Sequence, residues 1–336
     1  MATRTAFLTG GTGFVGSHVA EELLARGWHV RALVRSSPKW LAEISPGAPL
    51  TTVRGSLDDA GALREGVAGV EAVVHVAGLT RARTQGELDA ANVDGTRRLL
   101  EAVRDAGPAV GRVLVTSSLE AMGPNRTAPD GRAVPATELD TPAPVSMYGR
   151  SKARMEAMIA RDFADLAVTV VRPPAVYGPR EADIYEMVKG AARGLLPIVG
   201  DGAARRLSLV HVRDLARGMV DLLEAPGAAG GTYFVGDAEG YSWDEVRAAV
   251  EAALGRRTLR LPVPGALMGV AGAVSEGVGR LVGTLPPLTR DKAEAARHAW
   301  LCASGKAARD AGYAPEIRLD EGMRETVAWY RQQGWL

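Results

Sequence analysis

The chain has 336 residues, and its 40 basic and 39 acidic side chains leave a formal net charge of +1. This length is sufficient for a substantial core in one large domain or two connected ones, and the balanced charge gives no electrostatic reason to expect nucleic acid. A lone cysteine, Cys302, cannot form an internal disulfide, and the first apolar run begins too close to Met1 for a signal peptide. We therefore expect a cytoplasmic protein of the size of an enzyme.

Short apolar runs alternate with helical patterns through the first half of the chain. Strands of about five residues separated by helices are typical of a doubly wound parallel α/β sheet of the Rossmann type, with right-handed crossovers. The expected helices include Glu87–Ala106 and Tyr148–Phe163. The expected strands are Ala6–Thr9, His29–Val34, Leu50–Val53, Ala72–Ala77, Arg112–Ser117 and Ala167–Arg172.

A glycine-rich stretch, Thr9–Gly16, lies between the first expected strand and a helical pattern that begins at Ser17. A strand, a glycine turn and a helix in this order predict a dinucleotide site, with the phosphates at the helix N-terminus. Two spacings fit this stretch, Gly11-x-Gly13-x-x-Gly16 and Gly10-x-x-Gly13-x-x-Gly16, and the stretch alone does not choose between them.

The end of the second expected strand, Val30–Lys39, carries no carboxylate. An NAD-selective site usually has one about 20 residues after the glycines, where it binds the adenosine ribose. Arg35 occupies this region instead, and a guanidinium pairs well with a 2′-phosphate. We therefore predict NADP(H), while NAD(H) remains possible if Arg35 is only a solvated residue at the strand end.

A tyrosine and a lysine, Tyr148 and Lys152, are spaced to share one helix face. A free tyrosine has a pKa of about 10, and a neighbouring ammonium lowers it, so the pair can exchange a proton with a substrate hydroxyl or carbonyl. Thr116, Ser117 and Ser118 bring hydroxyls to the carboxyl end of a strand, where open α/β sheets bind ligands.

The second half of the chain is less regular. Proline-rich Thr127–Val145 is expected to form a loop over the carboxyl ends of the strands, and Thr232–Val235 to return as a late strand. From about Tyr241 the pattern is mostly helical, with breaks at Pro262, Pro264, Pro286 and Pro287. These features predict a discontinuous cofactor domain, residues 1–178 and 209–237, and a substrate domain of residues 179–208 and 238–336.

Leu261–Val274 contains no charge but is short for a membrane span and is interrupted by prolines and glycines. Glu276 and Arg280 pair away from an apolar stripe at helical spacing. We favour a helix packed on its own domain over a lid above an apolar ligand or a membrane-surface helix. The stripe consists of Leu267, Val270, Val274, Val278 and Leu281.

Together these motifs resemble an extended short-chain dehydrogenase/reductase of the NAD(P)-dependent epimerase/dehydratase superfamily, over almost the whole chain. Val30–Lys39 and residues 261–283 are most similar to the hydroxysteroid dehydrogenase and dihydroflavonol reductase-like branch. The resemblance implies the glycine spacing Gly10, Gly13, Gly16. It is carried by Thr9–Gly16, His75–Gly78, Asn92–Thr96, Thr116–Ser118, Tyr148–Lys152, Arg172–Pro179 and His211–Asp214.

The resemblance also implies roles for individual residues. Tyr148 is the general acid/base, Lys152 lowers its pKa and binds the nicotinamide ribose, and Ser118, or Ser117 in the other register, holds the reacting oxygen. Asn92 is either structural support or catalytic. The implied cofactor-binding residues are Gly10, Thr12, Gly13, Phe14, Val15, Gly16, Arg35, Ser36, Lys39, Ser56, Leu57, Ala77, Gly78, Tyr148, Lys152, Pro173 and Val176.

Several positions depart from the family pattern. Ser56 replaces an adenine-binding acid, so either Asp58 takes over the adenine contact or this contact is lost. Met122 replaces a substrate-side tyrosine. Leu207 stands where nucleotide-sugar enzymes have an arginine, with Arg205 and Arg206 displaced, and no acid is expected beside Tyr148, which Met147 precedes. We expect His75 and His211 to be structural, Trp300 and Trp329 to anchor the core, and no metal site. Trp335 is not assigned a role.

These observations predict an NADP(H)-dependent alcohol dehydrogenase or ketoreductase acting on a bulky, largely apolar hydroxy or keto compound. The alternatives are a nucleotide-sugar epimerase with tightly bound NAD and a non-catalytic cofactor-sensing protein of the same fold. The resemblance further implies a homodimer through the helices near Glu87–Ala106 and Tyr148–Phe163.

Overall fold

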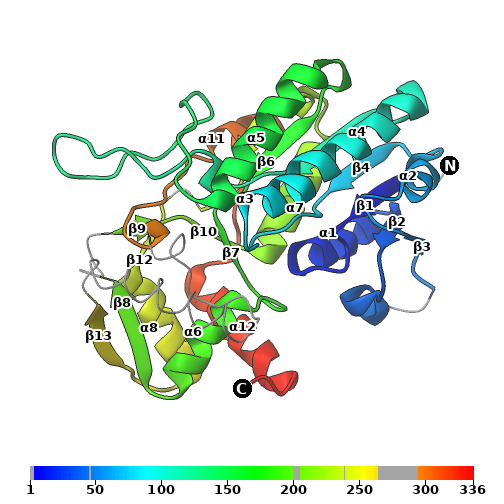
Figure 1. Cartoon of the computed structure of the whole chain (residues 1–336). Coiled ribbons are helices and arrows are strands. Elements are labelled where there is room, and N and C mark those ends of the chain that lie inside the picture. Colours follow the sequence, from blue (N-terminus) through cyan, green and yellow to red (C-terminus); the bar gives the residue numbers. More distant parts are fainter. Residues whose placement is uncertain (1–3, 45–46, 200–204, 238, 264–293) are drawn as a thin grey trace.

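The centre of the molecule is a parallel sheet of seven strands (Figure 1). A computed structural model describes residues 4–44, 47–199, 205–237, 239–263 and 294–336. The strand order is β3-β2-β1-β4-β5-β6-β11, which reverses direction between β1 and β4. The strands are β1 (Thr5–Thr9), β2 (His29–Val34), β3 (Leu50–Arg54), β4 (Ala72–His75), β5 (Arg112–Thr116), β6 (Thr169–Arg172) and β11 (Thr232–Phe234).

Helices cover both faces of this sheet, so each strand alternates its side chains between two apolar cores. Leu8 of β1 packs toward the first group of helices and Phe7 toward the second. The first group is α1 (Phe14–Ala25), α7 (Val212–Glu224) and α11 (Gly305–Ala311). The second is α2 (Ala60–Val67), α4 (Gly95–Ala106) and α5 (Met147–Asp162).

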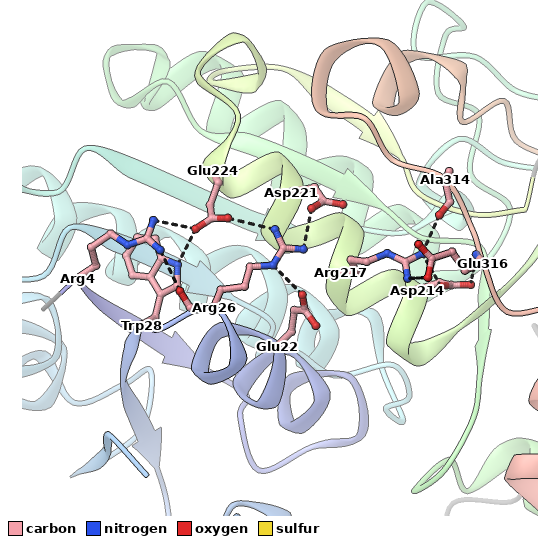
Figure 2. Close-up of polar contacts among 10 residues, drawn as sticks. All are labelled: Arg4, Glu22, Arg26, Trp28, Asp214, Arg217, Asp221, Glu224, Ala314 and Glu316. Carbon is pink, nitrogen blue, oxygen red and sulfur yellow. Dashed lines mark hydrogen bonds and ion pairs between the residues drawn. The ribbon is translucent and has the colours of Figure 1, made fainter.

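Ion pairs join α1 to α7 at the amino-terminal edge of the sheet (Figure 2). Arg26, which ends α1, contacts Glu22 at 2.7 Å, Asp221 at 2.7 Å and Glu224 at 3.1 Å. The Trp28 indole donates to Glu224 at 3.0 Å. The network is partly buried, so its charges are screened less than those of exposed pairs. It stabilises the edge of the molecule opposite the carboxyl ends of the strands.

Asp214 of α7 is a buried carboxylate that fastens a distant segment to the sheet (Figure 2). It accepts hydrogen bonds from the backbone N–H groups of Glu316 at 3.1 Å and Ile317 at 2.9 Å and from Arg217 at 2.8 Å. This segment leads directly into the last helix, α12 (Leu319–Gln332). Asp214 thereby connects the cofactor side of the chain to its C-terminal helix.

A smaller part of the molecule lies below the sheet in Figure 1. Its core is formed by α12, α6 (Asp183–Ala192) and α8 (Trp243–Leu254), with Val188, Val250 and Tyr330 fully buried. Three two-stranded pairs accompany these helices. The pairs are β10 (Leu209–His211) with β7 (Ala175–Tyr177), β12 (Tyr241–Ser242) with β9 (Arg206–Leu207), and β13 (Leu259–Val263) with β8 (Leu195–Val199).

The predicted sheet is confirmed strand by strand, and so is the late strand, since β11 pairs with β6. Thr127–Val145 is a loop whose only pairings among the described residues are isolated bridges. The expected helix Glu87–Ala106 is interrupted: α3 (Gln85–Asp89) and α4 flank one π-helical turn, Ala90–Asp94. The domain boundaries stay predictions.

The expectation of a mostly helical C-terminal region is wrong in part. Residues 259–263 form a strand, and Pro262 lies inside it rather than at a helix break. A proline is tolerated there because, among the described residues, β13 pairs with β8 alone and is an edge strand. The apolar stripe beginning at Leu267 lies outside the described residues. Among the described helices, none is both long and apolar enough to cross a membrane.

Candidate active site

The glycine turn joins β1 to α1 at the point where the strand order reverses. Gly10 has φ of 77°, and a Cβ there would lie 2.5 Å from the backbone nitrogen of Ala77. A Cβ on Gly16 would lie 2.1 Å from the carbonyl oxygen of Gly10. At Gly11 it would meet side chains only, at 3.1 Å or more, so the packing agrees with the spacing Gly10, Gly13, Gly16.

The N-terminus of α1 fits a phosphate group. Gly13 is the N-cap residue, and no side chain caps the helix. The first backbone N–H groups and the positive end of the helix dipole are therefore free to face an anion. Thr12, Phe14 and Val15 are half-buried around this turn. The residues present thus fit the pyrophosphate of a dinucleotide.

Ala77 and Gly78 follow β4, the neighbour of β1 in the sheet. The Ala77 N–H lies 3.4 Å from the Thr9 hydroxyl, which joins the ends of β1 and β4. A Cβ on Gly78 would lie 2.7 Å from the Asn92 side chain and 3.5 Å from the Lys152 Nζ. A larger residue at this position would therefore crowd Asn92 and Lys152. Leu79, the next residue, is exposed.

The segment after β2, where the adenosine end of a dinucleotide is predicted, is exposed and basic. Arg35, Ser36 and Lys39 are all exposed after β2. Arg54, the exposed last residue of β3, pairs in register with Val34, the residue before Arg35. Arg54 is not among the residues predicted from the sequence, although a cation at the end of the next expected strand was a usable signal.

The adenine side shows two further departures from the expected pattern. The Ser56 hydroxyl accepts from the Asp58 N–H at 3.2 Å, and the Asp58 carboxylate pairs with Arg98 at 2.7 Å. Asp58 therefore faces α4 and is already engaged. Leu57 lies against Gly95, where α4 begins. Ser56 and Leu57 stay predicted cofactor contacts, while the pairing of Asp58 with Arg98 disfavours the alternative that Asp58 takes over the adenine contact.

Tyr148, Ser118 and Lys152 come together at the carboxyl ends of β5 and β6. Ser146 caps α5 by accepting from the Gly149 N–H at 2.9 Å, which sets where the first turn carrying Tyr148 begins. The Ser118 hydroxyl lies beside the Tyr148 phenol and lowers its pKa. Lys152 is buried, and its Nζ donates to the Thr116 carbonyl oxygen at 2.7 Å.

The two candidate serines face different partners. Ser117 is fully buried and its hydroxyl donates to the carboxylate of Glu156, away from the phenol. Successive residues of a strand point to opposite faces, so only one of the pair can face Tyr148. The structure brings Ser118 to Tyr148, while Ser117 supports the interior.

Burial shifts both members of the Tyr–Lys pair. It raises the pKa of Tyr148, the nearby Glu120 carboxylate raises it further, and only the Ser118 hydrogen bond lowers it. Burial also lowers the pKa of Lys152 to about 8, against the charge of Glu156. The sequence predicted a lowered tyrosine pKa from the lysine alone, so the direction is opposite because the phenol is desolvated beside an anion.

Glu120 corrects the expectation that no acid lies beside Tyr148. It sits in a 3₁₀ turn, Leu119–Ala121, and its backbone N–H donates to the Ser118 hydroxyl at 3.1 Å. Its carboxylate accepts from the Ser146 hydroxyl at 2.5 Å. The turn folds the acid back toward the N-terminus of α5, a path that the sequence pattern alone did not indicate.

Asn92 supports the site from the π-helical turn. Its amide accepts from the Leu79 N–H at 2.8 Å and donates to the Leu79 carbonyl and to the Ser151 hydroxyl, each at 2.9 Å. The side chain is 1% exposed. Its bonds join the loop after Gly78 to α5, which favours the structural of its two predicted roles.

The two histidines are likewise held within the fold. His75 contacts the hydroxyls of Thr9 at 2.6 Å and Thr96 at 2.9 Å, and burial lowers its pKa to about 3. His211 caps α7 by accepting from the Arg213 N–H at 3.4 Å, and burial lowers its pKa to about 3 as well. Neither is charged at neutral pH, in agreement with a structural role.

The remaining predicted residues lie after β6, in β7 or in two of the apolar cores. Pro173 is buried and its carbonyl accepts from the Leu119 N–H at 2.8 Å, while Val176 is half-buried in β7. Met122 is buried against Trp300, so it belongs to a core. Trp329 and Trp335 pack in the core around α12.

Arg206, one of the two arginines displaced from the family position, is engaged within the fold. Arg206 donates to the Gly240 carbonyl at 2.7 Å and lies 3.5 Å from Glu245, so it holds the start of α8. Leu207 pairs with Tyr241 in β9 and β12. Over the described ranges of the chain, no group of three His, Cys, Asp or Glu side chains could hold a metal ion.

Comparisons with known proteins agree with this geometry. A model of the NAD dependent epimerase/dehydratase family matches residues 6–236. The chain is 32% identical to ceramide reductase of Caulobacter vibrioides, covering 98% of this chain and 95% of that protein. It is also 32% identical to 2-alkyl-3-oxoalkanoate reductase of Stenotrophomonas maltophilia, covering 96% and 98%.

A solved structure extends the likeness to the fold. DesIV, a dTDP-glucose 4,6-dehydratase of Streptomyces venezuelae crystallised with NAD bound, has a TM-score of 0.76 at 27% identity, covering 98% of each chain. The chain therefore belongs to the NAD-dependent epimerase/dehydratase family. Within it, the reductase-named relatives support an NAD(P)-dependent oxidoreductase of the extended short-chain dehydrogenase/reductase type.

Proposed function

We propose that this protein is an NADP(H)-dependent ketoreductase or alcohol dehydrogenase with a bulky, largely apolar hydroxy or keto substrate. The observation that carries the proposal is the position of Ser118 beside the Tyr148 phenol, one helical turn from the buried ammonium of Lys152. A proton donor, a hydroxyl beside it and a cation within the same crevice form a site for general acid/base chemistry on a carbonyl.

The nicotinamide supplies or accepts the hydride when it is bound. Ser118 orients the carbonyl oxygen by hydrogen bonding, and Tyr148 donates its phenolic proton to that oxygen as the alcohol forms. In the reverse direction Tyr148 accepts the proton. Lys152 stabilises the phenolate through its positive charge, and the Thr116 carbonyl keeps the ammonium in place at 2.7 Å. Glycines at Gly10 and Gly16 let the backbone approach the pyrophosphate.

Two observations support an apolar substrate. The exposed Leu79 side chain follows Gly78 directly, and the Leu79 backbone is held by Asn92. Nucleotide-sugar enzymes have an arginine at the position of Leu207. The neighbouring Arg206 instead donates to the Gly240 carbonyl and lies close to the Glu245 carboxylate. The names of the reductase relatives, a ceramide reductase and a 2-alkyl-3-oxoalkanoate reductase, point the same way.

The exposed cations at the adenosine end support NADP(H) over NAD(H). Arg35 and Lys39 follow β2, and Arg54 ends the neighbouring strand β3, where it pairs in register with Val34. A 2′-phosphate favours such a cluster, since guanidinium groups bind phosphate through charge-assisted hydrogen bonds. We further propose a homodimer in which α4 and α5 form the interface, which sedimentation analysis tests.

The proposal is tested by following nicotinamide absorbance while the purified chain is offered carbonyl compounds of increasing chain length. We expect NADPH oxidation that is faster with long apolar ketones than with short ones. Dinucleotide that remains bound through purification, together with no net oxidation of added NADPH, would indicate an epimerase instead. Absence of both turnover and bound dinucleotide would favour a cofactor-sensing protein.

A further inference from the structure

A buried carboxylate, Glu156, lies on the same face of α5 as Tyr148 and Lys152, since the three are spaced by four residues. Its partner is Arg172, and their side chains are 11% and 7% exposed. The Arg172 Nε lies 2.9 Å from one carboxylate oxygen and 3.2 Å from the other, which a second guanidinium nitrogen also contacts. Desolvation makes such a pair costly, so it is weak evidence for stability alone.

The Glu156 carboxylate reaches the end of β5. It accepts a hydrogen bond from the hydroxyl of Ser117. Ser117 stands between Thr116, whose carbonyl holds Lys152, and Ser118, which contacts Tyr148. The Glu156 carboxylate therefore holds Ser117 in place. Its two neighbours in sequence are the residues that contact Lys152 and Tyr148.

The same carboxylate reaches the end of β6 through Arg172, the last residue of that strand. Arg172 precedes Pro173, whose carbonyl accepts from the Leu119 N–H at 2.8 Å. The Arg172 guanidinium also lies 5.6 Å from the ring of Phe234 on β11. Glu156 is thus the point where α5 is tied to the ends of two neighbouring strands.

The negative charge of Glu156 also affects the pKa of Lys152. Burial lowers the pKa of Lys152 to about 8, and the Glu156 carboxylate is the group that opposes this shift. The other groups near the Tyr–Lys pair do not replace it. His75 of β4 is neutral because burial lowers its pKa to about 3, Glu120 acts on Tyr148, and Arg172 is a cation.

We propose that Glu156 is a positioning residue of this site: its buried carboxylate aligns the ends of β5 and β6 on α5 and keeps Lys152 charged. This inference rests on the proposed function, in which Lys152 acts as a cation. A purely structural Glu156 would affect folding alone and would leave the titration of Lys152 where it is.

The test measures the titration of Lys152 directly, without turnover. Acetylation of the full chain by a small anhydride is followed across pH, and the rate at Lys152 is read by peptide mass spectrometry. In Glu156→Gln we expect the midpoint to fall by about one pH unit, because the desolvated ammonium loses its nearby anion. In parallel, kcat for ketone reduction should fall by roughly 10- to 100-fold, with KM changed little.

Two further variants keep the inference open to refutation. Glu156→Gln leaves Arg172 buried without its partner, which destabilises the fold. The double variant Glu156→Gln with Arg172→Met removes both charges at similar volume and should show a fall in the Lys152 midpoint that has the same direction and is smaller, because a nearby cation is removed with the anion. Asp162→Asn is the matched control, since this carboxylate of α5 pairs with Arg97 at 2.8 Å and lies about 15 Å along the helix from Lys152.

A Lys152 midpoint that falls in both Glu156 variants and not in Asp162→Asn supports the inference. A midpoint unchanged or raised in the folded double variant overturns it. If the wild-type chain reduces no ketone, the proposed function fails, while the labelling curves still decide whether Glu156 keeps Lys152 charged.

Discussion

The two ends of the proposed cofactor site differ in the burial of their charged and polar side chains. At the end near α5, Lys152 is buried and Tyr148 is half-buried, and the pKa values of both are shifted. At the end near β2 and β3, Arg35 and Arg54 extend into solvent. Buried groups act strongly on one another because water does not screen them, while exposed cations attract an anion weakly and in a salt-dependent way. Chemistry and cofactor choice are therefore separable properties of this chain.

The largest contrast is expected within the buried end, between the two serines. Ser118→Ala removes the hydrogen bond that lowers the pKa of Tyr148, and we expect kcat to fall by about 100-fold. Ser117→Ala removes only a contact to Glu156, so its effect on kcat should be several times smaller. Steady-state ketone reduction by the two variants measures this difference. Equal losses in the two variants would argue against the assignment of Ser118.

A smaller effect is expected at the exposed end. Arg35→Ala should lower the preference for NADPH over NADH by about 10-fold, through KM rather than kcat, because it removes one phosphate contact. The same preference should decrease in wild type as salt is raised. Measuring kcat/KM with both cofactors at two ionic strengths checks this. Arg31→Ala is a control on the same strand, since Arg31 donates to carbonyls at the end of α2. A preference that Arg35→Ala leaves intact would refute the role of Arg35.

The smallest effect concerns the acid that the sequence analysis missed. Glu120 raises the pKa of Tyr148, so Glu120→Gln should lower it. Ketone reduction needs the protonated phenol and is lost as pH rises through this pKa, so its alkaline limb should move to lower pH. Alcohol oxidation needs the phenolate, so its acidic limb should move to lower pH too. Limbs that move apart, or toward higher pH, would contradict the proposed electrostatic effect of Glu120.

Local spacing was sufficient to predict much of this molecule. The glycine turn at Thr9–Gly16 and the Tyr148–Lys152 pair depend on neighbours in sequence, and most strands of the main sheet are short, mainly apolar runs. The sequence left open whether Ser117 or Ser118 faces Tyr148, because this depends on which side each residue points to. The contact of Ser117 with Glu156 distinguishes the two.

Long-range contacts were the part that could not be predicted. Glu120 reaches Ser146 across 26 residues, and Arg172 reaches Glu156 from another strand. The pKa of Tyr148 was predicted in the wrong direction because its burial depends on packing that spacing does not encode. The strands β9 and β12 have two residues each, which is too few for any period to be recognised.

The most direct test of the central claim is Tyr148→Phe. We predict that this variant oxidises NADPH in the presence of long-chain ketones at least about 100-fold more slowly than wild type, since it lacks the proton donor. Its affinity for NADPH, measured by the fluorescence of the bound dinucleotide, should stay within a few fold of the wild-type value. Turnover equal to wild type would remove Tyr148 from the mechanism and contradict the account.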